Sequence, residues 1–150
     1  MKILFLDVDG VLNCRRTPQL INDLYPLDPF MVLLVDRIIQ ATGCKVVLSS
    51  AWRNHPQGVE IIKKSIPLLD KTENFSSVRG EEIRKWLGDY VATCSMLNDK
   101  ECKEHRIKKY AILDDTDEFS GEQRDNFFKT IYEFGLTSEI AEKVITHLNS

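Results

Sequence analysis

The chain has 150 residues, of which 43% are hydrophobic and 29% charged, a mixture typical of a globular protein rather than of a disordered or fibrous one. This length suits one domain over residues 1–150, and the formal net charge of −3 argues against a broad nucleic-acid-coating surface, which would be strongly basic. No apolar run approaches the ~20 residues that span a bilayer. The start, MKILFLDVDG, lacks a signal-peptide cleavage site, so we expect a cytoplasmic protein without a membrane segment.

In the first half of the chain, short apolar runs alternate with helical patterns. The predicted elements are a buried strand over 3–6, a helix from Asp28-Pro29 to Gly43, a buried strand over 46–48 and a short helix over 58–66 that Pro67 closes.

The second half continues this alternation. A polar stretch over 70–77 leads to a helix whose core face is Ile83, Trp86, Leu87, Tyr90 and Val91. A charged stretch over 99–109 predicts a solvated helical face. The last elements are a buried strand over 110–113, an edge strand over 126–130 and a helix that Thr137 or Ser138 caps. The alternation predicts an α/β domain with a mainly parallel central sheet.

The cysteines and histidines show no metal-ligand spacing. They are spread over the chain at Cys14, Cys44, His55, Cys94, Cys102, His105 and His147. Because no pair of cysteines has CxxC spacing, we expect neither a zinc site nor a disulfide framework. Reduced thiols fit a cytosolic chain.

Polar residues follow each of the three buried strands. The pairs are Asp7 with Asp9, Ser49 with Ser50, and Asp114 with Asp115. Because ligands of open parallel sheets bind outside the carboxyl ends of the strands, we expect these pairs to meet at one site.

The four carboxylates of this predicted site would repel one another unless a cation lay among them. Oxygen ligands favour a hard divalent cation, and Mg²⁺ binds through one or two carboxylates together with water and substrate phosphate. We therefore predict a Mg²⁺ site among Asp7, Asp9, Asp114 and Asp115.

The segment Asp7-Val8-Asp9-Gly10 suits phosphoryl transfer. One carboxylate can attack phosphorus and form an aspartyl-phosphate, while a second carboxyl gives a proton to the leaving group and later takes one from water. Gly10 permits the backbone turn that this spacing needs. Ser49 offers a hydroxyl donor to the phosphoryl oxygens.

Three segments, FLDVDGVLN, VVLSSAWR and YAILDDTDEF, resemble motifs one, two and four of the haloacid dehalogenase (HAD) superfamily of phosphohydrolases. Together with the late GLTSE segment they make the chain most similar to a compact branch related to the phosphatase modules of RNA-repair proteins. The resemblance implies a three-layer, Rossmann-like (HAD-like) fold and a phosphatase that hydrolyses phosphate monoesters.

The resemblance also implies a role for each motif residue. Asp7 is the expected nucleophile, Asp9 the general acid and base, and Ser49 the hydroxyl of motif two. Mg²⁺ is expected on the Asp7 side chain, the Asp9 backbone carbonyl and Asp115, with Asp114 beside it or acting through water.

Motif three needs a Lys or Arg that neutralises the phosphoaspartate. Arg79, which precedes Gly80-Glu81-Glu82, is the first candidate and Lys85 the second. Gly10, Ser50 and Arg53 are the predicted substrate-binding residues. For Arg53 the alternative is that its guanidinium stem packs with Trp52 over the sheet edge.

The segments 10–27 and 51–113 leave no room for a large cap, since the second must also hold core helices and a strand. An open site suits a large substrate such as a nucleic-acid end or a phosphoprotein, and a small phosphoester is the alternative. Two other functions compete with catalysis. One is a phosphate-recognition or partner-binding module without turnover. The other is a CheY-like receiver domain, whose acceptor Asp normally ends a middle strand rather than the first.

Overall fold

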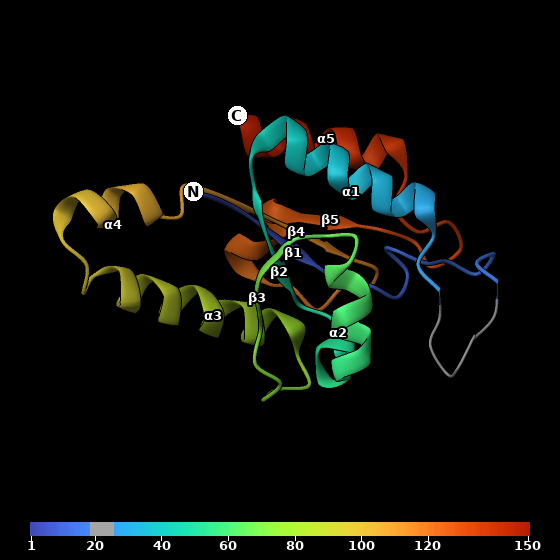
Figure 1. The fold of residues 1–150 in the computed structure, drawn as a ribbon, viewed down its shortest axis with the longest axis horizontal. Coiled ribbons are helices and arrows are strands. Elements are labelled where there is room, and N and C mark those ends of the chain that lie inside the picture. The colour runs from blue at the N-terminus through green and yellow to red at the C-terminus, as the bar shows by residue number, and fades with distance from the viewer. Residues whose placement is uncertain (19–25) are drawn as a thin grey trace.

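The computed structural model describes residues 1–18 and 26–150. Within these residues the chain forms a sheet of five strands in the order β3-β2-β1-β4-β5, with helices on both faces (Figure 1). Every pair of neighbouring strands is parallel. The predicted α/β class with a central parallel sheet is confirmed.

The elements have the following bounds. The strands are β1 (Lys2–Leu6), β2 (Lys45–Leu48), β3 (Leu68–Lys71), β4 (Lys109–Asp114) and β5 (Phe127–Lys129). The helices are α1 (Pro29–Thr42), α2 (Pro56–Lys63), α3 (Arg79–Cys94), α4 (Asp99–His105) and α5 (Ser138–Asn149), with short 3-10 helices η1 (Ala51–Asn54) and η2 (Gly121–Asn126).

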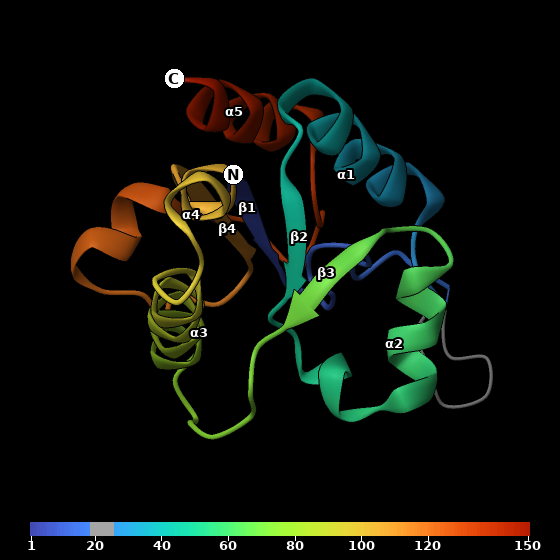
Figure 2. The same ribbon diagram turned by 60° about the vertical axis from the view of Figure 1, so that its left-hand side comes forward.

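Two apolar clusters bury the two faces of the sheet. Because alternate residues of a strand point to opposite faces, Leu4 and Leu6 of β1 pack into the cluster formed with α1, α2 and α5. Ile3 and Phe5 pack into the cluster formed with α3. Figure 2 shows α1 and α5 together on one side of the sheet and α3 on the other. Burial on both faces explains why β1 is continuously apolar.

The N-termini of α1 and α5 and the C-terminus of α1 follow the capping rules. The Asp28 carboxylate accepts a hydrogen bond of 2.8 Å from the Phe30 N–H, and Gly43 ends α1 in the left-handed conformation with φ 67°. The Thr137 hydroxyl accepts from the Ile140 N–H, so Thr137 rather than Ser138 is the cap of α5.

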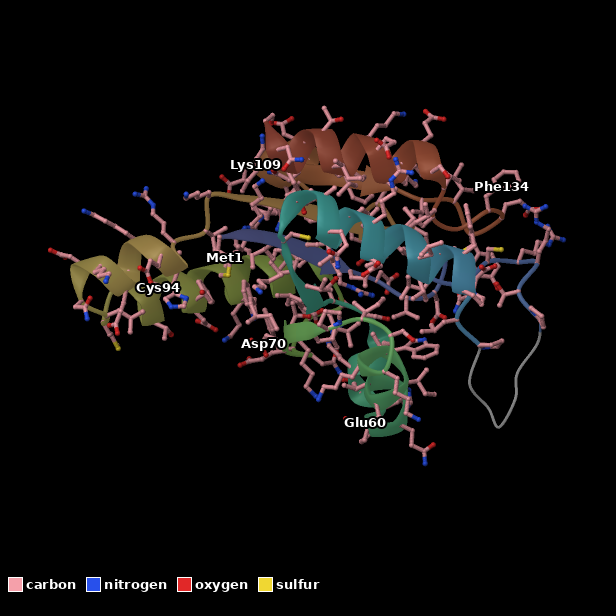
Figure 3. The ribbon with its side chains drawn as sticks, turned by 45° about the horizontal axis from the view of Figure 1, so that its top comes forward. Met1, Glu60, Asp70, Cys94, Lys109 and Phe134 are labelled. Carbon is pink, nitrogen blue, oxygen red and sulfur yellow. The ribbon has the colours of Figure 1, made fainter. Side chains whose placement is uncertain are left out.

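Some predicted elements differ from the structure. β3 occupies part of the stretch predicted as polar, because an edge strand whose last three residues are exposed shows no alternation of apolar and polar residues. α2 begins at Pro56 and ends at Lys63, earlier at both ends than predicted. Val91, predicted in the core, is 60% exposed. The end of α3, near Cys94, extends beyond the sheet together with α4 (Figures 1 and 3).

The other predictions for the second half agree with the structure. α4 has no buried residue, as expected for a solvated helix, although it ends at His105 and Lys109 already belongs to β4. β5 is the edge strand predicted over 126–130, and it lies parallel to β4.

The segment 51–113, described throughout, consists of η1, α2, β3, α3, α4 and the start of β4 and contains no separate cap domain. In the segment 10–27, the described residues form turns and loops without a helix or strand, and 19–25 lie outside the described residues. None of the helices described here is long and apolar enough to cross a membrane.

Two substitutions on α3 test this arrangement. Ile83 is 0% exposed and Val91 60%. Ile83→Ala should lower the free energy of unfolding by about 2–5 kcal/mol because it leaves a cavity. Val91→Ala should change it by less than about 0.5 kcal/mol. Urea denaturation followed by circular dichroism measures both, and similar losses for the two variants would contradict the placement of α3.

Candidate active site

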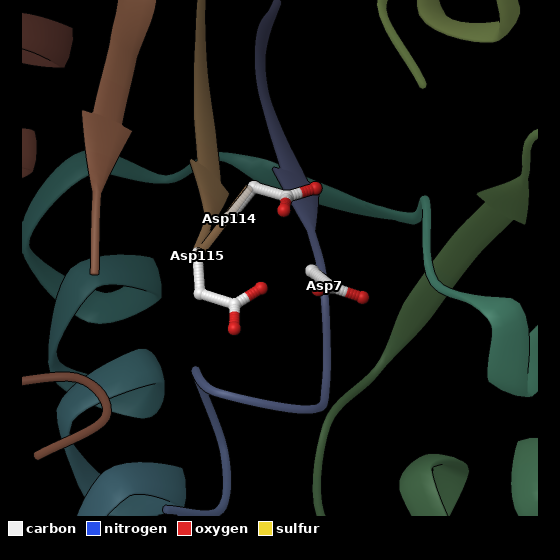
Figure 4. A group of neighbouring side chains, drawn as sticks. All are labelled: Asp7, Asp114 and Asp115. Atoms are coloured by element: carbon white, nitrogen blue, oxygen red, sulfur yellow. The ribbon is translucent and has the colours of Figure 1, made fainter. Parts of the chain in front are cut away.

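The carboxyl ends of β1 and β4 bring three carboxylates together (Figure 4). Asp7, Asp114 and Asp115 each offer an oxygen atom, and these atoms lie within 4.8 Å of one another. The pairing of Leu6 with Leu113 sets their position, and the Asp7 N–H donates to the Leu113 carbonyl at 3.0 Å. The predicted convergence of the strand ends is therefore present for these three residues, which we call the carboxylate cluster.

Burial and like charge make the ionised form of the cluster costly. Asp7 and Asp114 are both buried. The pKa of Asp7 is raised to about 6, mainly by burial and secondly by the charge of Asp114, although the charge of Arg79 opposes this rise. Burial likewise raises the pKa of Asp114 and of Asp115 above their ordinary value.

The carboxylate cluster fits a divalent cation. Asp114 Oδ2 is buried and has no hydrogen-bond partner among the described residues. Its nearest cationic group, Arg79 Nη1, lies at 4.0 Å, beyond hydrogen-bonding distance. An unpartnered carboxylate oxygen beside two further carboxylates is an oxygen donor set of the kind that Mg²⁺ prefers.

Arg79, and not Lys85, reaches the carboxylate cluster. Arg79 is the first residue of α3, and its Nη1 lies 3.4 Å from Asp7 Oδ1. Lys85 lies away from the cluster in ion pairs with Glu73 and Asp89. Of the two motif-three candidates, the geometry favours Arg79.

The start of α3 is held against the loop after β4, which positions Arg79. The Arg79 N–H donates to Glu118 at 3.0 Å, and Gln123 Nε2 donates to the Gly80 carbonyl at 2.8 Å. A Cβ at Gly80 would lie 2.6 Å from Gln123 Oε1, so a larger residue would push the helix end away.

Asp9 and Gly10 lie at the turn after β1. The Asp9 carboxylate is outside the carboxylate cluster and accepts hydrogen bonds from Asn13 at 2.8 Å and from Trp52 at 3.1 Å. Gly10 has φ 77°, and a Cβ there would overlap the Asp115 carboxylate. Glycine is therefore needed both for the turn and for the approach of Asp115.

The two serines after β2 have different surroundings. The Ser49 hydroxyl is buried and has no partner among the described residues. The Ser50 side chain lies near enough to Asp7 to oppose the rise in the pKa of Asp7, and its hydroxyl accepts a hydrogen bond from the Trp52 N–H at 3.3 Å. The role of Ser49 as a hydroxyl donor to the phosphoryl oxygens stays a prediction, and Ser50 is a second hydroxyl at the same strand end.

Arg53 forms a buried ion pair with Glu82. Arg53 Nη2 lies 2.6 Å from Glu82 Oε2, and the two side chains are 5% and 1% exposed. The guanidinium also donates to the Ser50 carbonyl and to Asn74, which leaves only its Nε without a partner among the described residues. Nothing in the sequence marked Glu82 for this role, because it looks no different from exposed Glu81 beside it.

A cavity of about 180 Å³ opens beside Arg79 and is lined mostly by polar and charged side chains, among them Ser76, Ser77 and Thr116. A larger cavity of about 570 Å³ lies between β3 and α3. None of the carboxylates of the cluster lines this second cavity, so we place the chemistry at the cluster and not there.

Comparison with known proteins identifies a family. Residues 3–141 match the family model described as the HAD domain in Swiss Army Knife RNA repair proteins. Neither the curated proteins nor the solved structures give a significant match. The resemblance inferred from the three sequence motifs is confirmed.

The raised pKa of Asp7 predicts a pH-dependent stability. The pKa of Asp7 is about 6 in the folded protein and 3.8 ordinarily, so the folded state binds the proton more tightly, and the contribution of Asp7 to stability falls as the pH rises from about 4 to about 6. In EDTA near pH 8, Asp7→Asn should therefore be more stable than the parent by up to about 3 kcal/mol, and the gain should shrink as the pH falls from about 6 to about 4. Unfolding measured across this range tests it, and a gain independent of pH would contradict it.

Proposed function

The chain belongs to the family of HAD domains in Swiss Army Knife RNA repair proteins, and we propose that it is a Mg²⁺-dependent phosphomonoester hydrolase that works through an aspartyl-phosphate on Asp7. The observation that carries this proposal is the carboxylate cluster at the ends of β1 and β4, in which Asp7 and Asp114 are buried and Asp115 half-buried, with Arg79 against Asp7. The family supports a phosphatase-type module. A site that combines carboxylates with a guanidinium also suits phosphoryl transfer.

The reaction has two halves. In the first, an oxygen of Asp7 bonds to phosphorus while the bond from phosphorus to the leaving oxygen breaks, and Asp9 gives that oxygen a proton. In the second, Asp9 takes a proton from water, the water oxygen bonds to phosphorus, and the bond from phosphorus to Asp7 breaks. Inorganic phosphate leaves, and both carboxyl groups return to their initial state.

Asp7, Asp114, Asp115 and the backbone carbonyl of Asp9 are the groups that would hold Mg²⁺. A bound Mg²⁺ supplies positive charge that offsets the repulsion among these carboxylates and the phosphoryl oxygens. The unpartnered Asp114 Oδ2 and the raised pKa values of the carboxylate cluster support this assignment.

Arg79 and the serines stabilise the transferred group. The guanidinium of Arg79 faces Asp7. It therefore neutralises negative charge when the phosphoryl group is bonded to an oxygen of Asp7. The hydroxyl of Ser50 lies next to Asp7, and the unpartnered hydroxyl of Ser49 is a further donor. A module without turnover is less well supported, because the Arg79 guanidinium lies 3.4 Å from Asp7 and is a candidate for the cation of motif three.

The proposed substrate is a phosphorylated nucleic-acid end, since the family carries the description of RNA repair proteins. No cap domain covers the site within the described residues, which agrees with a large substrate. A phosphoprotein or a small phosphoester is the alternative. A panel of 3′- and 5′-phosphorylated oligonucleotides, phosphopeptides and small phosphoesters distinguishes them.

Substitution of the nucleophile tests the function. With p-nitrophenyl phosphate and Mg²⁺, Asp7→Asn should lower kcat by about 10³-fold or more, and EDTA should abolish the parent's activity. Asp36→Asn, an equivalent change at an exposed position of α1, should leave kcat unchanged. Release of phosphate by Asp7→Asn at the parent's rate would reject the proposal.

Arg79 and Lys85 form a second pair for comparison. Arg79→Ala should lower kcat by about 10²-fold, because it removes charge stabilisation next to Asp7. Lys85→Ala should stay within about twofold of the parent, since Lys85 contacts Glu73 and Asp89 instead. Steady-state kinetics measure kcat for both variants. A larger loss of kcat in Lys85→Ala than in Arg79→Ala would assign motif three to Lys85.

A further inference from the structure

Both oxygens of the Asp9 carboxylate accept a hydrogen bond. Asn13 Nδ2 donates to Oδ1 at 2.8 Å and Trp52 Nε1 donates to Oδ2 at 3.1 Å. Asn13 lies in the turn after β1, and Trp52 lies in η1, which follows β2. The carboxylate is therefore held between loops that leave two neighbouring strands.

The two donors are themselves fixed. Asn13 Oδ1 accepts from the Gly10 N–H at 3.0 Å, so its side-chain amide cannot turn without losing a second bond. Trp52 is buried in the apolar cluster on the α1 face, and its backbone N–H donates to Ser50 Oγ. Gly58 lies against the indole ring, where a Cβ would be only 3.1 Å from Cε3.

Asp9 lies next to the carboxylate cluster, since it directly precedes Gly10, where an added Cβ would overlap the Asp115 carboxylate. A carboxyl that passes a proton to a leaving group must point one oxygen at that group. A misplacement of about 1 Å can cost about 10²-fold in rate. The orientation of Asp9 thus matters for the reaction proposed above.

We propose that Trp52 and Asn13 are positioning residues that hold the Asp9 carboxyl in the orientation for proton transfer to the leaving oxygen. This inference rests on the proposed phosphatase function, and it assigns to Trp52 a role beyond filling the core. The indole N–H orients one oxygen and the amide N–H the other, so loss of either bond lets the carboxyl rotate.

The chain contains a matched control in its other tryptophan. Trp86 is also nearly buried, and its Nε1 also donates to a carboxylate, Asp70 Oδ2, at 2.7 Å. Neither Trp86 nor Asp70 belongs to the carboxylate cluster, and the carboxylate that Trp86 contacts is not Asp9. Trp52→Phe and Trp86→Phe therefore remove the same kind of bond and the same volume at two different places.

The test compares two leaving groups. p-Nitrophenolate leaves without a proton, whereas the benzyl alkoxide of benzyl phosphate requires one. Because kcat/KM reports only on steps up to departure of the alcohol, Trp52→Phe should lower kcat/KM for benzyl phosphate by about 10²-fold and for p-nitrophenyl phosphate by less than about threefold. Asn13→Ala should show the same leaving-group dependence, and Trp86→Phe should show none.

Equal losses of kcat/KM for the two substrates in Trp52→Phe would overturn the proposal, because a purely structural role acts on both alike. If Trp52→Phe fails to fold, a measurement that does not depend on activity still tests the proposal. In the amide spectrum of ¹⁵N-labelled protein, Asp9→Ala should shift the Trp52 indole signal and leave that of Trp86 in place. An unmoved Trp52 signal would also overturn the proposal, whereas a parent protein that releases no phosphate from any substrate with Mg²⁺ present would reject the phosphatase function itself.

Discussion

The parallel pairing of β1 with β4 is the contact on which the site depends. It aligns Leu6 with Leu113, so that Asp7 and the Asp114-Asp115 pair leave the sheet side by side. Two buried carboxylates and a half-buried third repel one another and resist ionisation, as the raised pKa values indicate. Nearby positive charge is needed to offset the repulsion among these carboxylates, and the rest of the site is arranged to supply it.

Helix α3 brings the protein's own cation. Its first residue, Arg79, faces Asp7, and the contacts of Glu118 and Gln123 with the first turn hold it there. The buried pair of Arg53 with Glu82 fastens the same helix to the segment after β2. Because an unpaired buried charge is costly, loss of either member of that pair would disturb both the helix and the segment that carries Ser50.

The sequence was sufficient to predict what depends on local pattern. Continuous apolar runs predicted β1, β2 and β4, and the acids after two of them predicted the carboxylate cluster. Exposed β3 carries no periodic signal, and its strand character comes from pairing with β2. The placement of Ser50 beside Asp7, and the hydrogen bond from Trp52 to Asp9, depend on side-chain directions across loops that no local pattern encodes. Glu82 was missed for the same reason.

The most direct test of the central claim is a crystal structure of the protein with Mg²⁺ and beryllium fluoride, which mimics a phosphoryl group on a carboxylate. Trifluoroberyllate should be bonded to the Asp7 side chain, with one Mg²⁺ between it and the carboxylates that end β4, and with Arg79 turned toward the fluorides. Beryllium fluoride that leaves Asp7 unmodified, or a Mg²⁺ bound only at another part of the surface, would contradict the account.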